Sequence, residues 1–158
     1  MTLVLALAGL VTTLLGALGA PWVQARVAAR REHAARMRDR RMNLYERAFE
    51  LSDQYEEWIH WLCQPPWYMS RPTVAGDDEL QKLTARMRLA AAKDVWAAWS
   101  QFREAALSLD LALQHDPAYE DLDEHNEGLS ASDPYIAAVQ VAIVDLRTAV
   151  MQDVSSAG

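Results

Sequence analysis

The chain has 158 residues, of which 51% are hydrophobic, and a formal net charge of −7. This length allows one modest domain with a short appendage and excludes two domains of ordinary size. A single cysteine, Cys63, excludes an intrachain disulfide framework and permits a reducing compartment.

Charge is distributed unevenly along the chain. Residues 1–25 contain no charged side chain, while residues 26–47 contain eight arginines and three acids, a net charge of +5. Residues 48–158 contain seven basic and nineteen acidic residues, a net charge of −12. The overall charge therefore conceals an uncharged N-terminal segment, a basic stretch and an acidic remainder.

The first predicted element is a transmembrane helix over residues 1–23. Leu3 to Val23 is a nearly apolar run of 21 residues, and about 20 suffice to cross a hydrocarbon core roughly 30 Å thick. Trp22 lies where an interfacial aromatic residue is common. A cleaved signal peptide is the main alternative, but no Lys or Arg precedes the run and the best cleavage pattern, Ala17-Leu18-Gly19, is imperfect. A buried helix of a soluble protein is the third interpretation.

The positions of the arginines predict the orientation of this span. Positive residues close to a span stay on the cytoplasmic side, and all the nearby ones follow the apolar run. We therefore expect a protein of the cell membrane with its N-terminus outside and residues 26–158 in the cytoplasm. Small residues four apart, such as Gly16 and Ala20, would let two spans pack closely, so a homo-oligomer is a further expectation.

Residues 24–43 are predicted to form an Arg-rich helical stem next to the membrane. Its arginines serve as a topology signal on a solvated helix, or they contact anionic lipid headgroups. Nucleic acid is not expected as a partner, because no aromatic residue is interleaved with the arginines before Tyr45 and the attached domain is acidic. The candidate headgroup contacts are Arg26, Arg30, Arg31, Arg36, Arg38, Arg40 and Arg41.

Residues 44–154 are predicted to form a cytoplasmic helical domain, followed by a disordered tail at 155–158. Apolar residues recur at three- and four-residue spacing up to Cys63, again over 78–115, and again from Pro134 to about Val154. Asp77 or Asp78 and Asp133 are suited to cap the second and third helices. The predicted fold is all-α: the transmembrane helix leads into a long, coiled-coil-like antiparallel helical hairpin, and a third helix completes the core.

The segment 116–133 contains seven acids and no base and is expected to be a solvated loop. If the two long helices pack as an antiparallel hairpin, this loop returns to the level of the arginine stem and competes with lipid for it. It does not match a calcium-binding loop, because Asn126 stands where glycine is required. His115 and His125 lack the supporting ligands of a zinc site. We therefore expect neither a metal nor a cofactor.

Three tryptophans gather in "WIHWLCQPPWYM", residues 58–69. The simplest interpretation is that Trp58 and Trp67 close the core, and the alternative is a partner-binding tip made of Trp61, Trp67 and Tyr68. Cys63 and His60 lie on adjacent helical turns, but no third orienting group accompanies them. No catalytic residue is assigned, and an enzyme is not expected.

The apolar N-terminal run is followed by three helical stretches: "RVAARREHAARMRDRRMNLYERAFE", "LTARMRLAAAKDVWAAWSQF" and "VDLRTAVMQDV". In this layout the chain resembles a diffuse group of uncharacterised, single-pass membrane-anchored helical proteins of high-GC Gram-positive bacteria. The resemblance implies an architecture and transfers no site residue. The expected function is a membrane-anchored cytoplasmic scaffold or protein-interaction module with an unknown protein partner. The alternative is a small membrane-active or sensing protein whose span oligomerises.

Overall fold

The computed structural model describes residues 2–64, 72–74, 76–116, 119 and 128–156, with side chains for Trp22 and from Gln24 onward. This part of the chain contains four α-helices and no strand, so the predicted all-α class is confirmed. The chain divides into two units, residues 1–40 and 41–158.

Helix α1 extends from Thr2 to Leu62 without interruption. No glycine or proline occurs from Gln24 to Cys63, and Ala, Arg, Leu, Met and Glu, which favour helices, dominate this part. The prolines at 65 and 66 cannot continue a helix, which agrees with an end at Leu62.

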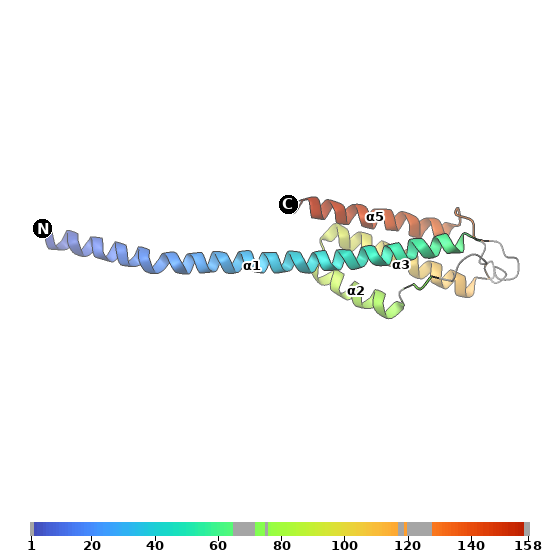
Figure 1. The fold of residues 1–158 in the computed structure, drawn as a ribbon, viewed down its shortest axis with the longest axis horizontal. Coiled ribbons are helices and arrows are strands. Elements are labelled where there is room, and N and C mark those ends of the chain that lie inside the picture. The colour runs from blue at the N-terminus through green and yellow to red at the C-terminus, as the bar shows by residue number, and fades with distance from the viewer. Residues whose placement is uncertain (1, 65–71, 75, 117–118, 120–127, 157–158) are drawn as a thin grey trace. The chain divides into compact units, whose positions relative to one another are not determined.

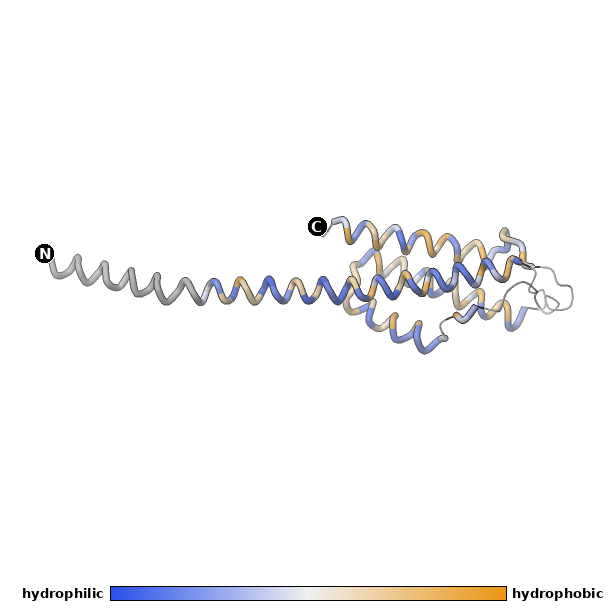
Figure 2. Tube along the Cα trace, viewed as in Figure 1, coloured by the Kyte–Doolittle hydropathy of each residue, from blue (hydrophilic) through white to orange (hydrophobic). Residues whose placement is uncertain are grey.

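The part of α1 in the first unit includes the predicted span and most of the arginine stem. The backbone of Leu3 to Val23 is helical, but its side chains, apart from Trp22, lie outside the described residues. From Gln24 to Arg40 every side chain is exposed except the half-buried Met37. Figure 2 shows this stretch as hydrophilic sections that alternate with short apolar ones. The stem therefore presents polar surface along its length.

The predicted second helix over 78–115 is wrong, because the chain forms two helices there. Helix α2 covers Asp77–Ala90 and helix α3 covers Lys93–His115, with extended backbone at Ala91 and Ala92. Side chains of α1 hold this break: Arg41 Nε donates to the Ala90 carbonyl (2.8 Å), and the Ala92 N–H donates to the Tyr45 hydroxyl (3.2 Å). Tertiary contacts therefore override the high helix propensity of the alanines.

This break replaces the predicted hairpin with four antiparallel segments. In the second unit, the last part of α1, α2, α3 and the final helix α5 (Pro134–Ser156) alternate in direction (Figure 1). The hydrogen bond from the Leu129 N–H to the Leu62 carbonyl (2.8 Å) places the start of α5 near the end of α1. The Tyr45 hydroxyl donates to Asp153 (2.7 Å), so the end of α5 lies near the start of this unit.

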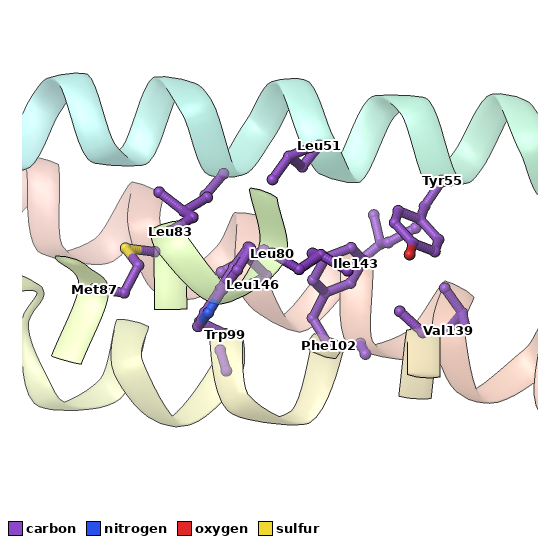
Figure 3. Packing of buried hydrophobic residues seen from close by; sticks show 14 of the residues in the cluster. Leu51, Tyr55, Leu80, Leu83, Met87, Trp99, Phe102, Val139, Ile143 and Leu146 are labelled. Atoms are coloured by element: carbon purple, nitrogen blue, oxygen red, sulfur yellow. The ribbon is translucent and has the colours of Figure 1, made fainter. Parts of the chain in front are cut away.

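All four segments contribute to one hydrophobic core (Figure 3). Tyr55 lies edge-on to both Trp58 and Phe102, with ring centroids 5.7 and 5.4 Å apart. Trp99 of α3 donates its indole N–H to the Thr84 hydroxyl of α2 (3.1 Å). The apolar periodicity therefore located the core correctly, and the fully buried members include Leu51, Leu80, Met87, Val95, Leu109, Ile136, Val139 and Leu146.

Two predicted helix caps have different outcomes. Asp133 accepts the N–H groups of Tyr135 and Ile136 (2.9 and 3.2 Å), so the expected cap of α5 is confirmed. Gly76 occupies the N-cap position of α2 without a side-chain hydrogen bond, so the expected cap by Asp77 or Asp78 is wrong. These two acids instead lie in the first turn, where negative charge is favourable.

Helix α5 is, among the described residues searched, the one helix that is long and apolar enough to cross a membrane. Its buried face nevertheless forms part of the core, and Arg147 pairs with Asp53 and Glu56 of α1 (both 2.6 Å). A core helix passes the same test of length and hydropathy, and the observation alone does not make α5 a span.

Candidate functional site

The arginines of residues 26–40 form the candidate lipid-facing site. All six arginine side chains in this range are exposed. Arg26 lies over the Trp22 ring, 5.1 Å from its centroid, which is a cation–π contact between the residues that end the apolar run and begin the stem. Arg36 forms a long ion pair with Glu32 (3.9 Å), and both side chains remain exposed.

The helical register distributes these arginines around α1. Successive residues of a helix turn by about 100° and rise about 1.5 Å, so Arg26, Arg31 and Arg36 fall on different sides. Arg26, Arg30 and Arg31 follow Val23 by three to eight residues, or about 5–12 Å along the axis. The headgroup layer adds about 5–7 Å on each side of the hydrocarbon core. Arg26 falls within this layer, and Arg30 and Arg31 lie beyond it by less than a Debye length of about 8 Å.

The second group lies farther along the helix. Arg36, Arg38 and Arg40 follow Val23 by about 20–26 Å, which exceeds both that layer and a Debye length of about 8 Å. Arg41 binds the Ala90 carbonyl and so has a structural contact. The seven candidate arginines are therefore not equivalent.

The described C-terminal end of the acidic loop does not lie beside Arg41, the candidate stem arginine that belongs to the second unit. Gly128 and Leu129 lie against Leu62 and Cys63 at the C-terminal end of α1. Leu62 follows Arg41 by 21 residues, or about 32 Å along the helix. The cause is the extra reversal at Ala91, which sends α3 back toward the far end of α1. Acidic residues 120–127 lie outside the described residues.

The aromatic tip is described only in part. Trp58 is buried, as expected, and Trp61 is half-buried and packs against the core. Trp67 and Tyr68 lie outside the described residues. Trp61 is therefore partly occupied by intramolecular packing, and the partner-binding tip stays a prediction.

Cys63 and His60 lack the features of a reactive pair. Burial raises the pKa of the Cys63 thiol, and the Asp133 carboxylate raises this pKa further. A reactive cysteine needs the opposite shift. The His60 ring lies 2.7 Å from the Gln64 side-chain nitrogen, which donates to it. In the described part of the chain, no group of three His, Cys, Asp or Glu residues could hold a metal ion.

Tyr45 is a residue that sequence reasoning placed in the apolar stripe and otherwise missed. Its buried hydroxyl joins three helices, because it accepts from Ala92 and donates to Asp153. Burial raises the pKa of Tyr45, the Ala92 hydrogen bond lowers it and Asp153 raises it. No local pattern could identify these partners, since they follow Tyr45 by 47 and 108 residues.

Two surface grooves border α5 in the second unit. One, of 590 Å³, lies against α3 and includes Ala105, Pro134 and Ala138. The other, of 320 Å³, lies against α1 and is lined mainly by apolar side chains, including Met42, Phe49, Met151 and Val154. The outward face of α5 between them was also missed by sequence reasoning, which considered only its core-facing residues.

Comparison of the chain with protein-family models, with curated proteins and with solved structures finds no match in any of the three. The function is therefore argued from the chain's own residues and contacts.

Proposed function

We propose that this protein is a membrane-anchored helical scaffold whose C-terminal unit binds another protein in the cytoplasm. The observation that supports it most directly is α1 itself. One uninterrupted helix contains the uncharged residues 2–25, the exposed arginines and the core residues of the second unit. The proposed anchor and part of the core of the second unit thus belong to the same helix.

The proposal assigns the two groups of arginines different partners. If Leu3 to Val23 spans the bilayer, Arg26 lies at headgroup depth and Arg30 and Arg31 lie just beyond it, near enough to the surface for each to be worth about 1 kcal/mol with anionic lipid. Their distribution around the helix suits a helix that crosses the headgroup layer better than one that lies flat on it. Arg36, Arg38 and Arg40 act in the topology signal, which extends about 15–20 residues from a span.

A binding function is favoured over catalysis. The raised pKa of Cys63 disfavours a thiolate nucleophile, and the sequence holds no recognised catalytic motif. A nucleic-acid partner is not favoured either, because residues 48–158 have a net charge of −12. The C-terminal unit instead offers exposed apolar residues on α5, which are typical of protein-interaction surfaces.

Alkaline carbonate extraction of membranes from expressing cells tests the anchor. The full chain is expected to stay with the membranes, and a variant that lacks residues 2–22 is expected in the supernatant. Because α5 also has the length and hydropathy of a span, the deletion variant separates the two candidates. Retention of this variant would assign the span to α5, and extraction of the full chain would refute an integral anchor.

A further inference from the structure

The outward face of α5 forms an apolar stripe that is exposed from Val141 onward, with Ala137 half-buried at its start. It consists of six uncharged positions, here named the α5 seam: Ala137, Val141, Val144, Thr148, Met151 and Ser155. The three largest are well exposed, with Val141 61%, Val144 60% and Met151 67% accessible. This second apolar face explains why α5 has the hydropathy of a span although its other face is in the core.

The two hydroxyl groups of the α5 seam are already satisfied within the helix. Thr148 Oγ1 donates to the Val144 carbonyl (2.8 Å), and Ser155 Oγ donates to the Met151 carbonyl (2.5 Å). A buried hydroxyl is costly mainly when it lacks a hydrogen bond. These two residues therefore do not oppose burial of the α5 seam against a partner.

The spacing of the α5 seam alternates four and three residues throughout, which is the heptad pattern of a coiled coil. With Val144 at position d, Val141 and Thr148 occupy position a, where β-branched residues are common in parallel two-stranded coiled coils, while position d holds Ala137, Val144 and Met151 in place of leucine. We propose that the α5 seam pairs with the same seam of a second copy of this chain, parallel and in register. The partner that the proposed scaffold binds is thus a second copy.

The flanking charges favour the parallel order. In a parallel pair, position g of one helix faces position e of the other, five residues later. Gln140 then faces Asp145 of the second copy, and Arg147 faces Gln152. In an antiparallel pair centred on Val144, like edges meet, so two Asp145 residues approach each other, whereas Arg147 is already paired with Asp53 and Glu56 of its own chain. Like charges in such positions repel, whereas an amide can bond either charge.

The size of the contact predicts a weak dimer. The α5 seam spans 19 residues, or fewer than three heptads, and sustained coiled coils have at least three or four. The two grooves beside α5 add apolar surface on either side. If the proposed anchor holds the chain in a membrane, the local concentration of copies rises and favours the dimer. The geometry of the α5 seam is independent of the anchor.

Disulfide crosslinking of the full chain in membranes tests the pairing. In a Cys63→Ser background, single cysteines are placed at Val141, Val144 or Met151 and oxidised with copper phenanthroline. Matched controls place the cysteine at Leu89 or Leu111, which are 86% and 56% exposed on α2 and α3. All three seam positions are expected to give covalent dimers and both controls to stay monomeric, because a disulfide needs Cα atoms within about 7 Å.

Each alternative outcome overturns the proposal in a different way. Crosslinking at Val144 alone would indicate an antiparallel pair, and equal crosslinking of the controls would indicate random collisions. Asp145→Asn is expected to leave the yield unchanged, whereas it would raise the yield of an antiparallel pair. The double substitution Val141→Asp and Val144→Asp should lower the crosslinking yield of the Met151→Cys chain at least about tenfold. Leu111→Asp in the same chain is the control, and circular dichroism confirms that each variant is folded. Carbonate extraction tests the anchor separately, so either proposal can fail alone.

Discussion

Tyr45→Phe is expected to destabilise the C-terminal unit although it removes a single oxygen atom. The hydroxyl accepts the Ala92 N–H at the break between α2 and α3 and donates to Asp153 of α5. Its removal leaves the N–H without this acceptor and deprives a carboxylate of a donor. Hydrogen bonds to charged groups are worth about 1.5–3 kcal/mol, and an unsatisfied buried donor costs about 1–3 kcal/mol.

Because Asp153 is only half-buried, we expect a combined loss of about 2–3 kcal/mol. This corresponds to a fall in melting temperature of about 4–12 °C for a chain of this size. Thermal melting of the full chain in mild detergent, followed by circular dichroism, measures it.

Tyr55→Phe is the matched control. The Tyr55 hydroxyl is also buried, but it lacks a partner with hydrogen-bond geometry among the described residues. Burial raises the pKa of Tyr55 most, and the nearby carboxylates of Asp110 and Asp77 raise this pKa further. Because Asp110 lies close to this hydroxyl, removal of the hydroxyl should cost some stability, but less than removal of the Tyr45 hydroxyl with its two well-formed hydrogen bonds. An unchanged melting temperature for Tyr45→Phe, or an equal loss for both variants, would refute the role given to Tyr45.

Three further results are expected. Gly128→Ala should destabilise the protein by about 1–3 kcal/mol, because the new Cβ would lie 2.6 Å from the Cys63 carbonyl carbon and oxygen. Gly76→Ala is the control: a Cβ there has nothing within 4 Å, so the free energy of unfolding should change by less than about 1 kcal/mol. Denaturant unfolding measures both variants. The free energy of unfolding should fall between about pH 10 and 12, because burial raises the pKa values of Tyr45 and Tyr55, and burial with Asp133 raises the pKa of Tyr119 to about 12. Tyrosines of the unfolded chain, with a pKa near 10, lose their protons first, and this favours the unfolded state as the pH rises. If the free energy of unfolding of Tyr55→Phe fell with pH as steeply as that of the parent chain, the prediction would be contradicted. Arg147→Gln should cost about 0.5–1 kcal/mol by removing the pairs with Asp53 and Glu56, and a cost unaltered in 1 M salt would argue against an ionic origin.

The sequence predicted the features that depend on local chemistry. The Asp133–Pro134 pair predicted the start of α5, and the prolines after Cys63 predicted the end of α1. The apolar spacing also identified most of the core, because burial follows the helical period directly.

The break at Ala91 could not be predicted in the same way. Apolar positions continue through it at helical spacing, from Met87 to Ala91 and Val95, and alanine is the strongest helix former. The break depends on side chains of α1 that lie nearly fifty residues earlier. Missing it gave the wrong topology for the second helix.

The arginine stem shows what sequence composition alone could not predict, namely the distance of each arginine from the apolar run. Its composition predicted a basic helix, but only a continuous helix sets the distance of each arginine from the apolar run. That register separates Arg26, Arg30 and Arg31 from the arginines that follow and assigns Arg41 to the fold.

The orientation of the chain in the membrane is the most direct test of the account. A reporter that is active only in the cytoplasm and one that is active only outside are each fused after Gly158. The account predicts activity from the cytoplasmic reporter alone, because the arginines hold the C-terminal unit on that side. Activity from the external reporter alone would contradict the proposed topology and the cytoplasmic scaffold that depends on it.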